Sequence, residues 1–186
     1  MQTMGLKMLS KNNTGLIITD MQGKLAGMVS DSDTVIQNTR VLIQGAKALN
    51  LPIIWLEQMP EKLGETITPI KTVLDGHTPI TKSTFNACLS NEFMRAIEYS
   101  SVDDWLICGI EAHICVYQTA LALSDLGYQV ELVSDCISSR NETHKQLAIS
   151  KLTSLGIAET NVEMCLYELV KDADLPEFKQ ILPLVR

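Results

Sequence analysis

The stretch DDWLICGIEAHICVYQTA, residues 103–120, connects an apolar run to a helical pattern through a glycine. We predict a strand over residues 104–109 and a helix over residues 113–126. Cys115 falls in or near the first turn of that helix, where the positive end of the helix macrodipole favours a thiolate over a thiol. The stretch therefore predicts a strand–turn–helix unit with a candidate nucleophile close to its turn.

The same alternation of strand and helix extends along the rest of the chain. Short apolar runs alternate with segments whose apolar residues recur at helical spacing. The expected strands are residues 15–20, 51–57, 79–82, 104–109, 128–135 and 162–167. The expected helices are residues 30–50, 91–100, 113–126, 142–155 and 172–182. The segment 58–76, punctuated by proline and glycine, is expected to be irregular.

This order of elements predicts the fold class. Strands that alternate with helices are typical of a parallel sheet covered on both faces, and right-handed crossovers make it doubly wound. We expect an α/β fold: a single-domain, doubly wound, mostly parallel six-stranded sheet with helices on both faces. A chain of 186 residues without repeats or linkers suits one domain over residues 1–186.

Charge, hydropathy and cysteine content indicate which partners and which cellular compartment to expect. The net charge of −7 argues against a broad nucleic-acid surface, which needs a basic footprint. The first eight residues lack the apolar stretch of a signal peptide, and no run is long enough to span a bilayer. Five widely spaced cysteines without a CxxC pair fit a reduced protein better than a disulfide framework. We expect a cytoplasmic protein with no membrane or nucleic-acid partner.

The sequence also gives little reason to expect a metal or a cofactor. Its three histidines are spread along the chain, and the acidic pairs at 31/33 and 172/174 are better interpreted as helix-start charges. No GxGxxG motif follows the first expected strand, which disfavours dinucleotide binding. We therefore predict no metal and no cofactor.

Polar residues lie at or just beyond the ends of four of the expected strands. Asp20, Lys82 and Cys115 each lie at or beyond a strand end, as does Glu57. Ligands of open parallel sheets bind outside these carboxyl ends. An ammonium would stabilise a thiolate, a carboxylate could accept the thiol proton and later return it, and backbone N–H groups near Gly109 could bind an oxyanion. The combination suggests a nucleophilic hydrolase.

Each of these residues also has an ordinary structural interpretation. A buried cysteine is usually a small hydrophobe, an aspartate after a strand is often a turn residue, and a lone lysine is usually a surface charge. Only the combination of Asp20, Lys82 and Cys115 favours a site. His113 lies two residues before Cys115, so a Cys–His dyad is an alternative, but we interpret it first as a pocket or capping residue.

With these residues identified, the chain resembles the isochorismatase-like cysteine hydrolases from about residue 15 to about residue 167. The matching pieces are LIITDMQ (16–22), ITKSTF (80–85) and GIEAHICVYQTA (109–120). The resemblance implies a Rossmann-like sheet, a homo-oligomer and a triad of Asp20, Lys82 and Cys115. It also implies a non-proline cis peptide between Ile110 and Glu111, with the N–H groups of Glu111 and Cys115 forming the oxyanion hole.

Departures from the family patterns are informative. Members that hydrolyse isochorismate have no cysteine at the position of Cys115, so vinyl-ether hydrolysis is not expected. Nicotinamidases carry an Asp-x-His metal motif after the second strand, whereas this chain reads LEQMP at 56–60. The run 57–66 instead resembles the isochorismatase domain-containing proteins, whose physiological substrates are poorly defined.

The resulting hypothesis is a metal-independent cysteine hydrolase that acts on a small-molecule amide or related C–N bond through a Cys115 thioester. Gln22, Glu57, Phe85 and His113 are candidate pocket residues. Two alternatives stay open: a non-catalytic binding or scaffold protein on the same fold, and a thiol redox enzyme, although no resolving cysteine lies near Cys115 in sequence.

Overall fold

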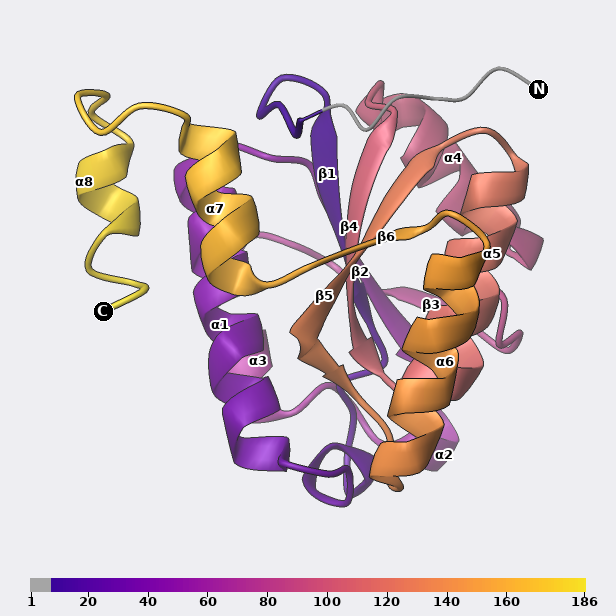
Figure 1. Ribbon diagram of the computed structural model, residues 1–186. Helices are drawn as coiled ribbons and strands as arrows, with labels where there is room; N and C mark the ends of the chain where they lie inside the picture. The colour runs from indigo at the N-terminus through magenta and orange to yellow at the C-terminus, as the bar shows by residue number, and fades with distance from the viewer. Residues whose placement is uncertain (1–7) are drawn as a thin grey trace.

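The computed structural model describes residues 8–186 and contains a parallel six-stranded sheet (Figure 1). The strand order is β3-β2-β1-β4-β5-β6, and every pair of neighbouring strands is parallel. The strands are β1 (Thr14–Thr19), β2 (Ile53–Gln58), β3 (Ile80–Lys82), β4 (Asp104–Ile110), β5 (Gln129–Ser138) and β6 (Ala158–Thr160). The expected doubly wound α/β fold is confirmed. Residues 1–7, where the sequence predicts no signal peptide, lie outside the described residues.

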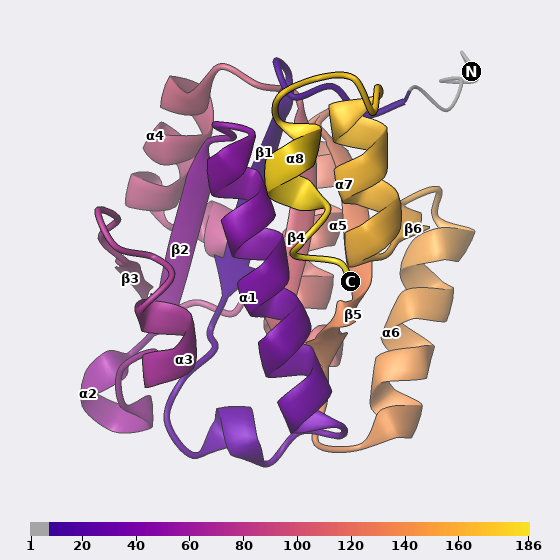
Figure 2. The same ribbon diagram turned by 90° about the vertical axis from the view of Figure 1, so that its left-hand side faces the viewer.

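Helices cover both faces of this sheet, as the two views show (Figures 1 and 2). One face carries α1 (Ser32–Ala48), α3 (Thr68–Lys71), α7 (Val162–Val170) and α8 (Phe178–Ile181). The other face carries α4 (Asn91–Ser100), α5 (Tyr117–Asp125) and α6 (Glu142–Ser154), while the short α2 (Pro60–Leu63) follows β2. Among residues 8–186, no helix combines the length and the hydropathy that crossing a bilayer requires.

The central strands divide their side chains between two hydrophobic cores. In β1, Leu16 and Ile18 pack on the face of α1 and α7, whereas Ile17 packs on the face of α4, α5 and α6. Successive strand side chains point to opposite faces, so a strand buried on both sides has no polar alternation. This explains why the central strands appear in the sequence as uninterrupted apolar runs.

The sixth strand lies elsewhere than expected. Residues 162–167, predicted as a strand, belong to helix α7, and the sixth strand is the three-residue β6 just before it. Asn161 caps α7 by accepting a hydrogen bond from the Met164 N–H at 2.9 Å. The helix buries apolar residues at intervals of three and four along the chain, which is helical spacing. They are Val162, Cys165, Leu166, Leu169 and Val170.

Two other segments also differ from the prediction. Residues 172–182, expected as a helix, are helical only over Phe178–Ile181. Asp172 accepts a hydrogen bond from the Asp174 N–H at 2.9 Å, which forms a local turn, and Pro176 disfavours helical backbone before it. The segment 58–76, expected to be irregular, contains the two four-residue helices α2 and α3.

The winding of the sheet reverses between β1 and β4. From β1 the chain continues outward to β2 and β3, returns to β4 beside β1, and then continues outward to β5 and β6. Ligands of doubly wound sheets bind outside the carboxyl ends of strands at such a switch point. Asp20 lies directly after β1, and Cys115 lies in the turn that follows β4.

β1 and β4 approach each other most closely at this switch point. Gly109 pairs with Thr19 and has a positive φ of +111°. A Cβ atom on Gly109 would lie 1.9 Å from the backbone oxygen of Thr19, a distance that no side chain tolerates. Glycine at 109 therefore lets the two strand ends meet just before Asp20.

Gly109→Ala should lower the free energy of unfolding by more than about 3 kcal/mol, because the added methyl group meets both an unfavourable φ and a backbone collision. Gly127→Ala is the matched control: φ there is +95°, but a Cβ would meet no atom within 4 Å. It should cost only about 1–2 kcal/mol. Urea unfolding followed by tryptophan fluorescence measures both, and equal losses would contradict the importance of the close approach.

Candidate active site

Asp20 follows the last residue of β1 in a left-handed backbone conformation, with φ of +52°. Its N–H donates to the Leu56 carbonyl at 3.2 Å, and its own carbonyl accepts from the Gln22 N–H at 2.7 Å. Aspartate adopts this conformation more readily than most residues do. The residue is only 1% exposed, so the turn directs its carboxylate into the protein.

Lys82 is the last residue of β3 and forms a buried ion pair with Asp20. Its Nζ donates to Asp20 Oδ2 at 2.8 Å, and the two side chains are 0% and 2% exposed. Nζ also donates to Gln58 Oε1 at 2.7 Å. An ammonium has three N–H donors, so these two bonds leave one for a third group.

Cys115 lies in a π-helical turn, Ala112–Val116, immediately before α5. It is 6% exposed, and its thiol interacts with both Asp20 and Lys82. π-helical turns of this kind are frequent at functional sites. The structure thus brings together the three residues that the sequence places at three different strand ends.

The surroundings of Cys115 favour the thiol over the thiolate, whereas the helix dipole considered alone favours the thiolate. Burial raises the pKa of the thiol, the negative charge of Asp20 raises it further, and only the Lys82 ammonium acts in the opposite direction. The partial charge of a helix terminus is smaller than these effects. A neighbouring base must therefore remove the proton when the sulfur attacks.

Asp20 is placed to be that base. Burial raises the pKa of its carboxyl group above the ordinary value, and Lys82 opposes this shift. Lys82 donates to Oδ2, and the Cys115 thiol is the other neighbouring donor to this carboxylate, whose buried Oδ1 has no further partner among residues 8–186. The carboxylate therefore has an oxygen free to accept a proton and a raised pKa that helps it hold one.

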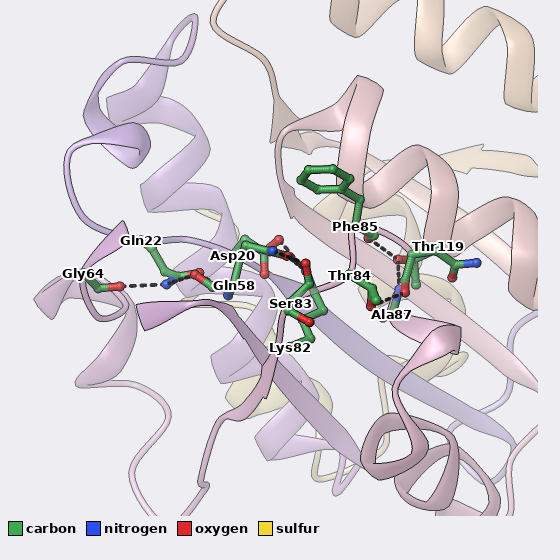
Figure 3. A network of polar contacts seen from close by, with 11 residues as sticks. Asp20, Gln22, Gln58, Gly64, Lys82, Ser83, Thr84, Phe85, Ala87 and Thr119 are labelled. Carbon is green, nitrogen blue, oxygen red and sulfur yellow. Dashed lines mark hydrogen bonds and ion pairs between the residues drawn. The ribbon is translucent and has the colours of Figure 1, made fainter. Parts of the chain in front are cut away.

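Gln58 belongs to the site but was not among the sequence-based candidates. Its side chain accepts from Lys82 and donates to the Ser83 carbonyl at 2.8 Å, which fixes the orientation of the amide (Figure 3). Register could have revealed it, because Gln58 pairs with Lys82 across β2 and β3. Sequence spacing alone did not give that register.

Gln22 holds Gln58 in place instead of lining an open pocket. Its Oε1 accepts from the Gln58 N–H at 2.6 Å, and its Nε2 donates to the carbonyls of Gln58 and Gly64 at 3.2 Å and 2.7 Å (Figure 3). Gln22 is 0% exposed. Its amide thus links the loop after β1 to the end of β2 and to the segment that follows α2.

Glu57, another pocket candidate, is directed toward the segment after α2. It accepts from the N–H and the hydroxyl of Thr66, both at 2.7 Å, and Thr66 Oγ1 accepts from Trp55 Nε1 at 2.8 Å. Its charge still raises the pKa of Asp20 slightly. Glu57 therefore anchors residues 64–67 beside the site.

Glu111 and His113 face the loop between β5 and α6. The Ile110–Glu111 peptide bond is cis, and Glu111 Oε1 accepts from the Arg140 N–H and Nε, both at 3.0 Å. Burial raises the pKa of Glu111, but the Arg140 contacts outweigh this and hold it below its ordinary value. His113 Nδ1 contacts Ser139 Oγ at 2.8 Å, and burial lowers its pKa.

The His113 contacts support a local packing role more than a Cys–His dyad. Its ring lies 4.7 Å from the ring of His144, centroid to centroid, at the start of α6. Phe85, the remaining pocket candidate, is 54% exposed, and its ring projects away from the polar network (Figure 3). Phe85 is thus free to contact a ligand.

The other cysteines differ from Cys115 in their surroundings. Cys108, Cys136 and Cys165 are fully buried in the apolar core. Cys88 is half-buried, and burial raises the pKa of its thiol to about 11. Within residues 8–186, no group of three or more His, Cys, Asp or Glu side chains is arranged to hold a metal ion.

Comparison with known proteins adds a family context. The family profile described as isochorismatase domain matches residues 14–163. Isochorismatase domain-containing protein 2 from Danio rerio is 33% identical to this chain over 177 residues, which cover 95% of this chain and 89% of that protein.

Two solved structures resemble the chain over nearly its whole length. The structure of MAR1 ribonuclease from Caenorhabditis elegans has a TM-score of 0.91 and 32% identity, covering 96% of this chain and 92% of that one. The YcaC gene product of Escherichia coli, described as an octameric hydrolase of unknown specificity, has a TM-score of 0.90 and 23% identity, covering 98% and 92%. At that identity, the second likeness concerns the fold alone.

Lys82→Met should lower the free energy of unfolding at pH 7 by roughly 3 kcal/mol, because it leaves the Asp20 carboxylate buried without its counter-ion. Adding Asp20→Asn should recover most of that loss. The folded pKa of Asp20 is raised, so in Lys82→Met the loss should grow as pH rises and shrink toward pH 5, where the carboxyl can be protonated. Urea unfolding at both pH values tests this, and additive losses in the double variant would count against a direct interaction.

Iodoacetamide labelling of Cys115 should respond oppositely to the two charges beside it. Asp20→Asn removes a charge that raises the thiol pKa, so labelling should move to lower pH; Lys82→Met removes a charge that lowers it, so labelling should move to higher pH. Peptide mass spectrometry across a pH series gives the midpoints. Cys88 is the internal control and should keep the same profile in all three proteins; parallel shifts at Cys88 would indicate general unfolding.

Proposed function

Because this chain belongs to the isochorismatase family, we propose that it is a metal-independent cysteine hydrolase that cleaves a small-molecule amide or related C–N bond. The observation that carries this proposal is the buried Lys82–Asp20 ion pair, at 2.8 Å, with the Cys115 thiol beside it. An isolated buried cysteine needs neither charge. A thiol that must lose its proton, attack a carbonyl and then recover the proton needs both.

In the first half of the proposed reaction, Cys115 Sγ attacks the amide carbon while its proton passes to Asp20. The resulting oxyanion is held by the N–H groups of Glu111 and Cys115, which remain predicted rather than observed donors. Asp20 then gives the proton to the leaving nitrogen, the C–N bond breaks, and an amine or ammonia departs. A Cys115 thioester is left.

In the second half, Asp20 takes a proton from water, and the hydroxide attacks the thioester. The C–S bond breaks, the acid leaves, and Asp20 returns the proton to sulfur. The sum is amide plus water giving acid plus amine, with the enzyme regenerated. Lys82 stabilises whichever of the two neighbouring groups carries the negative charge, because its ammonium interacts with both.

The alternatives predict different behaviour. A non-catalytic binding protein would retain the fold but turn over no amide. A thiol redox enzyme would need a resolving thiol, and Cys108 is fully buried in the core. A ribonuclease, as the C. elegans structure is described, would need to bind a polyanion, which a net charge of −7 disfavours.

The proposal also covers the cellular location and the oligomeric state of the protein. We place the protein in the cytoplasm, and the support is that all five cysteines are free thiols, as in a reducing compartment. We also propose a homo-oligomer, as the family resemblance implies; exposed apolar side chains such as Tyr99 (92%) and Leu89 (70%) are compatible with a buried interface. The octameric state is a property of the E. coli protein.

Wild-type protein should release ammonia or amine from at least one member of a panel of small amides, and Cys115→Ala should lose that activity by 10³-fold or more, roughly the effect of removing a nucleophile. Cys88→Ala is the matched control and should remain active. Intact mass spectrometry after rapid acid quench should show an acyl adduct on the wild type and on Cys88→Ala, but not on Cys115→Ala.

Turnover that persists in Cys115→Ala would overturn the mechanism. Tight binding of an amide without release of amine by the wild type would favour the binding-protein alternative. Degradation of RNA by the wild type but not by Cys115→Ala would replace the amide with a different substrate class.

A further inference from the structure

Thr119 lies in α5, four residues after Cys115, and its hydroxyl bonds to a different part of the chain. The Ala87 N–H donates to Thr119 Oγ1 at 3.1 Å, and the hydroxyl makes a long hydrogen bond of 3.5 Å to the Phe85 carbonyl (Figure 3). Threonine hydroxyls within helices often bond to a carbonyl of the preceding turn. Here the fully buried hydroxyl instead joins the helix of the nucleophile to the segment 83–87.

The segment 83–87 begins directly after Lys82 and is held at both ends. At its start, the Ser83 carbonyl accepts from Gln58 Nε2 at 2.8 Å. At its end, Thr119 binds the Ala87 N–H. Only four residues lie between Lys82 and Ala87 in the sequence. A displacement at Ala87 therefore has little chain over which to relax before it reaches Lys82.

Few other acceptors could replace Thr119 Oγ1 for the buried Ala87 N–H. Ala87 is 0% exposed and packs in the core with Val116 and Ala120, which flank the start of α5. A buried backbone N–H that loses its acceptor must find another or bring in water. Loss of the Thr119 hydroxyl would consequently move this segment rather than leave it in place.

We propose that Thr119 is a positioning residue: by fixing the segment 83–87 to the helix of Cys115, its hydroxyl sets the position of the Lys82 ammonium relative to the Cys115 thiol. The inference rests on the proposed function, because the relative position of these two groups matters only if they react together. In this proposal, Thr119 links β3, which carries Lys82, to the helical segment that carries Cys115, although Thr119 itself lies outside the triad.

The test is the pH dependence of iodoacetamide labelling at Cys115 in Thr119→Val, which keeps the shape of threonine and removes the hydroxyl. A less well placed ammonium stabilises the thiolate less, so the labelling midpoint should rise by about half a pH unit, which makes labelling below the midpoint roughly threefold slower. Thr119→Ser retains the hydroxyl and should show the wild-type midpoint. A purely structural role would lower stability without moving the midpoint.

Two controls separate position from general destabilisation. Thr153→Val makes the same substitution in α6, where the hydroxyl donates to Ile149 of its own helix at 2.9 Å, and should leave the midpoint unchanged. Gly127→Ala lowers the stability of the protein at a position away from the site, and it should also leave the labelling midpoint of Cys115 unchanged. If Thr119→Val shows no cooperative urea transition, Thr119→Ala replaces it, with an upward shift again expected.

An unchanged midpoint in the folded Thr119 variant would overturn the inference. Lys82→Met, measured alongside, distinguishes the two levels of failure. If Lys82→Met shifts the midpoint and Thr119→Val does not, only the positioning role is lost. If neither variant shifts it, the proposed chemistry of Lys82 and Cys115 is overturned as well.

Discussion

The site depends on a buried ammonium and a buried carboxylate that lie 2.8 Å apart, Lys82 and Asp20. Either charge alone would be expensive to remove from water, and the pair is tolerated because each is the other's counter-ion. The surrounding contacts serve this arrangement. Gln58 accepts from a second N–H of the ammonium, Gln22 holds Gln58, and Gly109 lets the ends of β1 and β4 meet just before Asp20. The result is a buried cysteine whose thiol pKa is raised, beside the carboxylate that we propose as its base.

Much of the fold could be predicted because its physical cause is local. A central parallel strand is apolar on both faces, and a helix is apolar at every third or fourth residue, so β1, β4 and α1 are visible in the sequence. Residues whose apolar pattern fits both a buried strand and a helix are predicted wrongly. Residues 162–167 are apolar enough to resemble a buried strand, but the cap at Asn161 and the later apolar residues Leu169 and Val170 make them helical. Strand order and register depend on long-range pairing, which no local pattern contains.

The candidate site also contains residues that could be predicted from the sequence and residues that could not. Asp20, Lys82 and Cys115 were predictable because strand ends of a parallel sheet share one edge and because three complementary residue types stood there. Gln58 and Thr119 were not, since their roles arise from contacts between segments distant in the sequence. The factors that raise the pKa of the Cys115 thiol were not predictable either: the helix dipole can be inferred from sequence, whereas the depth of burial and the nearness of Asp20 require coordinates.

Phe85 stands apart from this network in a way that bears on how such a protein diversifies. Its backbone carbonyl is tied to α5 through Thr119, yet the residue is 54% exposed. Lys82 and Asp20 are thus held by buried contacts, whereas the Phe85 side chain is exposed. Under the proposed function, a substitution at this position would change which compound is bound and leave the buried Asp20–Lys82 pair intact. Substrate choice and chemistry would then evolve separately in proteins with this architecture.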